Sequence, residues 1–363
     1  MKNLRLITLL TLLLSSTVLV AQDSNSTTTT ENLMTELVKG KKVAGITAGY
    51  SILGGPQWSD SKGHRDCKTK QRFEATTITR IASIAKPMTA IAILQLREQG
   101  KIDIDQPIQH YLPQFPKKAK GEITTRHLIQ HAAGIGAYES NKERQNKIEY
   151  TDLESAISIF KDRELLSTPG QNHSYSSYGY ILLGRIVEIV SGMKYQDYIQ
   201  KNIWDVAGMA NTSVEVYGKI YNNKSKLYHK KRKAKRAKQT NLSDRIPAGG
   251  IQSTLEDLLK FGDALLSGKL ISEESWELMI TNSEVKKDRN YFGLGLYLYG
   301  ENPLIGNLYG HSGSQTGCSA MLFLAPEKKA TIVAVTNTSR ANNEIGKVTM
   351  SLFEAVDSAS SSQ

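Results

Sequence analysis

The chain has 363 residues, with 46 Lys and Arg against 35 Asp and Glu, so its formal net charge is +11. A hydrophobic fraction of 39% is enough to bury a sizeable core, which excludes a disordered chain and a multi-pass membrane protein. Two cysteines exclude a disulfide-rich scaffold and a cysteine-based zinc ribbon.

Residues 1–21 have the features of a secretory signal peptide. Lys2 and Arg5 precede an apolar stretch over residues 6–20, and Ala21 is a suitable small residue for the cleavage site. The alternative is a membrane anchor, but this stretch is shorter than the roughly 20 residues that span a bilayer. We therefore expect an exported protein, either periplasmic or secreted.

A polar leader and a first strand follow the signal peptide. Residues 22–32 are rich in Ser and Thr and predict a flexible leader. Residues 43–53 are rich in small and β-branched side chains and run into Gly54-Gly55, which predicts a strand and a tight turn. Export would allow Cys67 and Cys318 to pair, although two separate thiols are the simpler expectation.

The most informative stretch is residues 79–100, TRIASIAKPMTAIAILQLREQG. Its middle is almost wholly apolar, which predicts a helix that is buried on all sides. Pro87 fits only the first turn of a helix, so the helix should begin near Ser83. Ser83 then lies at the positive end of the helix dipole, with Lys86 one turn further along the same face. A desolvated lysine has a lowered pKa and can accept a serine proton.

Two histidines in the next part of the chain raise the question of a metal site. His127 and His131 have the i, i+4 spacing of a zinc pair, but no Glu follows His127 and no third ligand is evident. We therefore expect a structural pair and predict no metal and no cofactor. Further helices are predicted over residues 178–191 and 254–266, the second with an N-cap pattern.

Most of the excess positive charge lies in one segment. Residues 224–238, KSKLYHKKRKAKRAK, contain nine Lys and Arg and no acid, so the rest of the chain carries only +2. A nucleic-acid-binding protein usually spreads basic charge over a face of its fold, so no nucleic acid partner is expected. The segment is either a solvated insertion or a contact for an anionic surface.

Strand patterns return near the C-terminus, over residues 291–299, 318–324 and 331–336, the last two as an antiparallel hairpin. A helix should follow over residues 345–356, and residues 358–363 predict a polar tail. The fold class is therefore α+β. An antiparallel sheet made from both ends is flanked by helices, with a mainly helical insertion over about 84–288 in one domain over 33–357.

Three short motifs occur in order along this domain: SIAK at 83–86, YSS at 175–177 and HSG at 311–313. They resemble the S-x-x-K, Y-x-N and (K/H)-(T/S)-G motifs of the serine β-lactamase and penicillin-binding protein superfamily. Residues 33–356 look most similar to the branch of class C β-lactamases, D-Ala-D-Ala carboxypeptidases and esterases, and especially to its mitochondrial members. The expected fold is then that of β-lactamases and transpeptidases.

The resemblance implies a role for each motif residue. Ser83 would attack a carbonyl and form an acyl-enzyme, while Lys86 and Tyr175 share its proton. The backbone N–H groups of Ser83 and Ser314 would form the oxyanion hole. The remaining motif residues would bind substrate, with His311 and Ser312 facing a substrate carboxylate or the Tyr175 hydroxyl: Ser177, His311, Ser312 and Gly313.

Two departures from the family pattern narrow the expected function. Ser177 replaces the usual asparagine and has one hydroxyl donor in place of two amide donors, and His311 replaces a lysine. Both changes favour an exported hydrolase of peptide amides or small esters over a dedicated β-lactamase. Alternatives are a D-Ala-D-Ala carboxypeptidase or weak β-lactamase, and, from another class, a non-catalytic binding or scaffold protein.

Overall fold

A seven-stranded antiparallel sheet lies at the centre of the computed structural model, which describes residues 24–145, 147–230, 235–283, 285 and 291–361. The predicted signal peptide lies outside the described residues. The strand order is β3-β2-β1-β12-β11-β10-β9. In chain order the strands are β1 (Gly45–Ile52), β2 (Gln57–Asp66), β3 (Gln71–Arg72), β9 (Tyr297–Asn302), β10 (Gly306–Gln315), β11 (Cys318–Ala325) and β12 (Ala330–Thr336).

Both ends of the domain contribute to this sheet, as predicted. β1 pairs with β12 in a register that places Ile46 opposite Thr336. β11 and β12 form the expected antiparallel hairpin, closed by a 3₁₀ turn over Pro326–Lys328. The strand expected over 291–299 begins only at Tyr297, because Gly295 has a φ of +89° and interrupts the extended backbone.

One face of the sheet is covered by helices from the two ends of the chain, α1 (Ser24–Lys39), α12 (Asn342–Met350) and α13 (Phe353–Ser361). The flexible leader predicted over 22–32 is therefore wrong from Ser24 onward, and the tail predicted from residue 358 is helical to Ser361. Thr30 is fully buried, and its hydroxyl forms a 2.8 Å hydrogen bond with that of Ser351. Packing of one helix face thus overrides a polar composition that by itself gives little helix stability.

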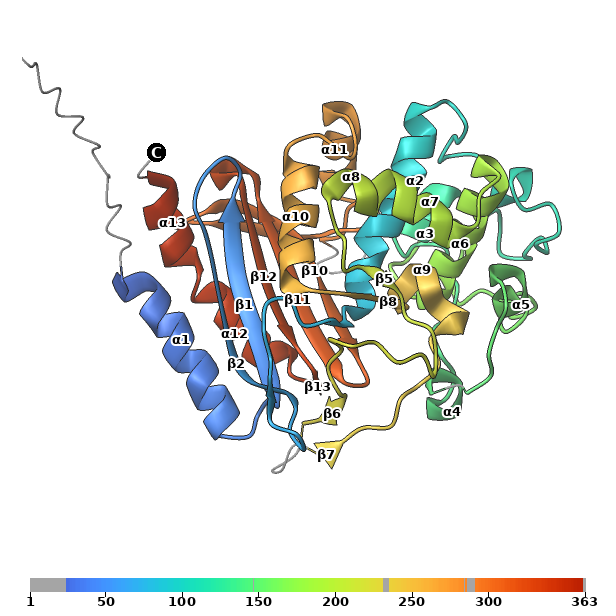
Figure 1. Cartoon of the computed structure of the whole chain (residues 1–363). Coiled ribbons are helices and arrows are strands. Elements are labelled where there is room, and N and C mark those ends of the chain that lie inside the picture. The colour runs from blue at the N-terminus through green and yellow to red at the C-terminus, as the bar shows by residue number, and fades with distance from the viewer. Residues whose placement is uncertain (1–23, 146, 231–234, 284, 286–290, 362–363) are drawn as a thin grey trace, which may run out of the picture.

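The opposite face carries the long insertion between β3 and β9 (Figure 1). α10 packs directly against β1 and β12, and the other helices lie further out. In the described part of the chain, no helix is both long and apolar enough to span a bilayer. The helices are α2 (Ala85–Glu98), α3 (Thr125–Ile129), α4 (Asn141–Arg144), α5 (Leu153–Ile157), α6 (Ser177–Ser191), α7 (Tyr195–Ile199), α8 (Asp205–Ala207), α9 (Ile246–Gly249), α10 (Leu255–Leu266) and α11 (Glu273–Ile280).

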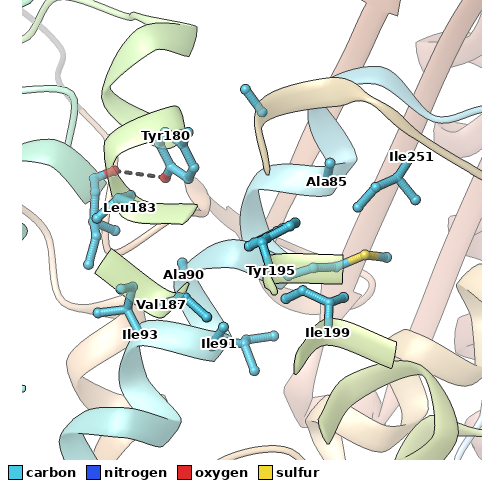
Figure 2. Packing of buried hydrophobic residues seen from close by; sticks show 14 of the residues in the cluster. Ala85, Ala90, Ile91, Ile93, Tyr180, Leu183, Val187, Tyr195, Ile199 and Ile251 are labelled. Carbon is cyan, nitrogen blue, oxygen red and sulfur yellow. Dashed lines mark hydrogen bonds between the residues drawn. The ribbon is translucent and has the colours of Figure 1, made fainter. Parts of the chain in front are cut away.

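α2 is the central helix of the insertion, and it is buried on all sides as its sequence predicts. Eleven of its residues are buried, and Figure 2 shows side chains of α6 and α7 packed against it. The hydroxyl of Tyr180 lies in this apolar region and donates to the Ile129 carbonyl oxygen at 2.9 Å. A helix so enclosed has little freedom to shift, which fixes the position of any group attached to its first turn.

Two small sheets connect the insertion to the main sheet. β4 (Thr79–Arg80), β8 (Ile251–Ser253) and β5 (Ser213–Val214) form one of them. The other consists of β13 (Thr338–Ser339), β6 (Tyr228–His229) and β7 (Lys235–Arg236).

A buried ion pair ties four distant segments together beside these sheets. The Arg80 guanidinium contacts both carboxylate oxygens of Glu215, at 2.6 and 2.8 Å, and the two side chains are 0% and 1% exposed. The same guanidinium donates to the carbonyl oxygens of Thr240 and Thr316. Burial alone would raise the pKa of Glu215, but Arg80, with help from Lys224, lowers it to about 2. The carboxylate therefore remains charged throughout the neutral range.

Both cysteines are free thiols, in line with the simpler expectation. The Cys318 thiol is buried and donates to the Arg80 carbonyl oxygen at 2.8 Å. Cys67 is partly exposed, and its backbone N–H donates to the Tyr228 hydroxyl.

Glu215→Gln should destabilise the fold by about 3–5 kcal/mol, because it leaves the Arg80 guanidinium buried without its counter-charge. Asp105→Asn is the matched control, since the Arg126–Asp105 pair has the same 2.6 Å distance but its side chains are 30% and 59% exposed. That control should cost less than about 1 kcal/mol. Urea unfolding of both variants measures the difference, and equal losses would contradict the structural role given to Glu215.

Candidate active site

Ser83 lies in a tight turn between β4 and α2. The turn is a 3₁₀ helix over Ala82–Ile84, so the regular α-helix begins two residues later than the predicted start near Ser83. Ala82 has a φ of +49°, a left-handed conformation that is unfavourable for a residue with a side chain. Gly313 of β10 packs against this turn so closely that a Cβ there would lie 2.3 Å from the Ile81 carbonyl oxygen. The sheet thus holds the serine in place.

The amine of Lys86 is completely buried beside Ser83. Its Nζ atom lies 3.1 Å from Ser83 Oγ, 3.4 Å from Ser177 Oγ and 2.8 Å from the Ala248 carbonyl oxygen. The rings of Tyr175 and Tyr180 flank it, with centroids 4.9 and 5.5 Å away. The predicted pair of Ser83 and Lys86 is therefore in hydrogen-bond contact, and Ser177 lies next to both.

These surroundings make Lys86 a suitable base near neutral pH. Burial, with a smaller contribution from the positive charge of Arg245, lowers the pKa of Lys86 to about 7. A neutral amine has two N–H donors and one lone pair. When Ala248 O and Ser177 Oγ accept the two donors, the lone pair faces the Ser83 hydroxyl. When the amine is protonated, the same three oxygens accept all three N–H groups, so both states are satisfied.

Tyr175 lies close to the same serine and stays protonated. Burial raises the pKa of its hydroxyl, while a hydrogen bond to Ser83 acts in the opposite direction. A hydroxyl that keeps its proton is unsuited to act as the initial base, but it is suited to pass a proton onward. These pKa shifts suit Lys86 to accept a proton and Tyr175 to donate one, and both roles remain predictions.

Ser83 opens onto a cleft of about 430 Å³ that Ser177 and Ser314 also line. Ser314 directly follows Gly313, the residue that packs against the turn of Ser83. The sheet therefore brings the two predicted oxyanion-hole residues to one cleft. Their N–H groups as the oxyanion donors remain a prediction.

His311 is enclosed by the protein, with only 1% of its surface exposed. His311, Ser312 and Gly313 are not among the residues that line the cleft. Its Nδ1 atom lies 2.6 Å from the Ser312 carbonyl oxygen, and only a protonated Nδ1 can make that contact. Burial, followed by the charge of Lys86, lowers the pKa of His311 to about 3. Of its two expected partners, a substrate carboxylate and the Tyr175 hydroxyl, the enclosed position of His311 favours Tyr175, whose ring centre lies 6.2 Å from that of the imidazole. The substrate-binding role of His311 remains a prediction.

The histidines considered as a zinc pair both accept hydrogen bonds from the backbone. His127 Nδ1 accepts from the Thr124 N–H in a capping box at the start of α3. His131 Nδ1 accepts from the Ser176 N–H at 3.2 Å, and its ring lies against that of Tyr175 with centroids 4.2 Å apart. Their role is to position backbone and ring, and His131 in particular supports Tyr175.

Two site features have no counterpart in the sequence-based predictions. The Ala248 carbonyl oxygen is the nearest contact of the Lys86 amine, and a backbone atom carries no residue-type signal. Arg245 lines the cleft, pairs with Asp244 at 2.7 Å and lies 4.5 Å from the ring centre of Tyr138. The only sequence hint was that Arg245 lies two residues before the PAGG turn.

The cleft has a strongly basic lining. Lys230 and Arg245 are each paired with an acid, Glu344 and Asp244, whereas Arg144 and Arg340 are exposed. Among the described residues that line the cleft, none is acidic. The basic side chains of the lining are Arg144, Lys230, Arg245 and Arg340.

Comparison with known proteins identifies the family of the chain. The model of the Beta-lactamase family matches residues 30–356, and the chain therefore belongs to that family. It is 32% identical over 292 residues to the serine beta-lactamase-like protein LACTB, mitochondrial, of Homo sapiens, an alignment that covers 62% of this chain and 53% of that protein. The chain thus spans about half the length of that relative.

Two further relatives are penicillin-binding proteins. Penicillin-binding protein 4* of Bacillus subtilis is 27% identical over 301 residues, covering 76% of this chain and 64% of that protein. The octameric penicillin-binding protein homologue from Pyrococcus abyssi superimposes with a TM-score of 0.77 at 26% identity, covering 86% of this chain and 73% of that one. The predicted superfamily and the α+β fold class are confirmed.

Lys86→Met should abolish activity and yet stabilise the fold below pH 7. The pKa of Lys86 in the folded protein, about 7, lies below the ordinary value of about 10.4. Burial of the charged amine therefore destabilises the wild-type fold, and this cost has its full size below pH 7. That cost fades as the pH rises from about 7 to 10.4 and is absent above this range. Below pH 7 the variant should gain on the order of 2–4 kcal/mol in free energy of unfolding. This gain is smaller than the whole cost of burying the charge, because the Ala248 carbonyl oxygen loses its hydrogen-bond partner in the variant.

Thermal unfolding of wild type and Lys86→Met across this pH range is the measurement. The advantage of the variant should shrink steadily with rising pH. A difference that does not change with pH would mean that the Lys86 pKa is not lowered by folding.

Proposed function

We propose that the protein is a hydrolase that forms an acyl-enzyme on Ser83 and acts on peptide amides or small esters. The observation that carries the proposal is the buried Lys86 amine, 3.1 Å from Ser83 Oγ, with a pKa of about 7. Membership of a family of serine hydrolases supports the reaction type. The choice of substrate is argued from the cleft.

The reaction begins when the Ser83 hydroxyl attacks the substrate carbonyl carbon and gives its proton to the lone pair of Lys86. The carbonyl oxygen becomes an oxyanion, which the N–H groups of Ser83 and Ser314 stabilise. The leaving group departs with the proton of Tyr175, which takes a replacement from the Lys86 ammonium. Water then attacks the acyl-enzyme and gives one proton to Lys86. As the ester bond breaks, this proton passes to Ser83 Oγ and the acid product leaves.

The basic lining of the cleft favours substrates with an acidic group close to the scissile bond. A peptide that ends in a carboxylate has this property, which keeps a D-Ala-D-Ala carboxypeptidase as the more specific alternative. Ser177 offers one hydroxyl where an asparagine would offer an amide, and its oxygen already contacts Lys86 at 3.4 Å. We therefore expect β-lactams to be poor substrates.

Ser83→Ala should abolish covalent labelling by a fluorophosphonate and lower turnover of a p-nitrophenyl ester by about 10⁴–10⁶-fold. Ser314→Ala is the matched control, because it lines the same cleft and keeps its backbone N–H. Intact-protein mass spectrometry reads the labelling. If wild type neither labels nor turns over any ester or peptide, the non-catalytic binding protein is the correct description.

Arg340→Gln should lower kcat/KM for a peptide acid about three- to tenfold while leaving the matching peptide amide almost unchanged. Arg340 is exposed at the cleft, where it can reach a substrate carboxylate without moving the serine. Lys101→Gln, at the far end of α2, is the control. If kcat/KM falls equally for the peptide acid and the peptide amide, Arg340 does not interact with the substrate carboxylate.

A further inference from the structure

An exposed apolar loop lies on the surface beside the small sheet of β6 and β7. Residues 216–221, VYGKIY, present Ile220 at 87% exposure, Val216 at 46% and Tyr217 at 43%. Single exposed apolar residues are common on soluble proteins, but three within five residues are not a random scatter. The arrangement calls for a contact that would cover them.

The loop holds these side chains outward in a defined turn. The Lys219 N–H donates to the Val216 carbonyl oxygen at 3.3 Å, and Gly218 has a φ of +78° that suits a tight turn. From the inner side, the Tyr221 hydroxyl accepts from the Val216 N–H and contacts the Val214 carbonyl oxygen. The backbone that carries the apolar side chains is therefore held in a defined turn before any partner binds.

Basic side chains surround the same loop. Lys219, Lys226 and Arg236 line one shared hollow with Ile220, together with Lys224. The nearest acids are held below this surface: Glu215 pairs with Arg80 and Lys224, and Asp66 is 8% exposed. We call Val216, Tyr217, Lys219, Ile220, Lys226 and Arg236 the docking patch.

We propose that the docking patch binds the surface of a membrane that contains anionic phospholipids. Lysine and arginine are attracted to the anionic headgroups, while the aliphatic and aromatic tips enter the boundary with the acyl chains. A nucleic acid or a soluble anionic glycan would use the positive charge but would leave Ile220 and Val216 uncovered. The combination of both features in one surface favours the membrane.

The position of the docking patch relates it to the cleft. The hairpin of β6 and β7 separates them, since His229 and Lys230 line the cleft while Leu227 and Arg236 line the hollow of the patch. Docking through the patch brings the cleft close to the membrane surface. Substrates that are anchored at or concentrated on that surface would then reach Ser83 most readily.

The test compares binding of the full chain to phosphatidylcholine vesicles with and without phosphatidylglycerol, by co-sedimentation at low salt. Wild type should bind the anionic vesicles at least about tenfold more tightly, and this preference should fall with added salt. Val216→Ser with Ile220→Ser, and separately Lys226→Gln with Arg236→Gln, should each weaken binding about tenfold. The apolar stretch over residues 6–20 is present in wild type and in every variant, so its contribution to vesicle binding is the same in all of them.

Matched controls are Leu166→Ser, an apolar residue elsewhere whose 63% exposure lies between those of Val216 and Ile220, and Lys101→Gln with Lys201→Gln near the far end of α2. These should bind like wild type, and all variants should retain turnover of a small ester, which shows that they are folded. Equal binding to both kinds of vesicle, or wild-type binding by both patch variants, would overturn the proposal. Loss of binding in the charge variant alone, with equal affinity for heparin, would assign the patch to a soluble polyanion instead.

Discussion

A primary amine with no exposed surface is the constraint on which this site depends. An ammonium ion loses several kcal/mol when it leaves water, so the interior around Lys86 must either compensate the charge or lower the pKa. The structure does both. Three oxygens are placed to accept the N–H groups of the amine, and two tyrosine rings flank it. Burial, together with the positive charge of Arg245, lowers its pKa. The burial of the first turns of α2 therefore serves the chemistry as well as the core, because it keeps the Lys86 amine away from solvent.

Each oxygen around this amine comes from a different part of the fold. Ser83 follows β4, Ser177 begins α6, and Ala248 belongs to α9 just before β8. The sheet contributes indirectly, because Gly313 of β10 presses on the turn that presents Ser83. With a buried, neutral imidazole at His311, the fixed positive charges that face a substrate come from the cleft wall and not from the HSG triplet.

Residues whose roles depend on local spacing were predictable, and residues whose roles depend on the path of the chain were not. Ser83 and Lys86 are one helical turn apart, so their contact follows from the sequence once Pro87 fixes the start of the helix. The antiparallel hairpin of β11 and β12 is equally local. By contrast, the burial of His311 results from the aromatic side chains packed around it, and the carbonyl of Ala248 has no sequence signature. The helix of α1 was missed for a similar reason, since it is stabilised by tertiary packing against β1, β2, α12 and α13, which includes the hydrogen bond between the hydroxyls of Thr30 and Ser351.

The buried guanidinium of Arg80 has a consequence for how the protein loses its activity. It joins the strand before Ser83 to Glu215, to Thr240 and to the turn at Thr316. Because Thr240 and Thr316 line the cleft, this wall of the cleft forms only when the four segments are packed together. Separating Glu215 from Arg80 leaves a buried charge without its partner, and separating Thr240 or Thr316 removes hydrogen bonds from the same guanidinium. Loss of the site and loss of the fold should then be a single cooperative event, with no partly unfolded form that still holds a working cleft.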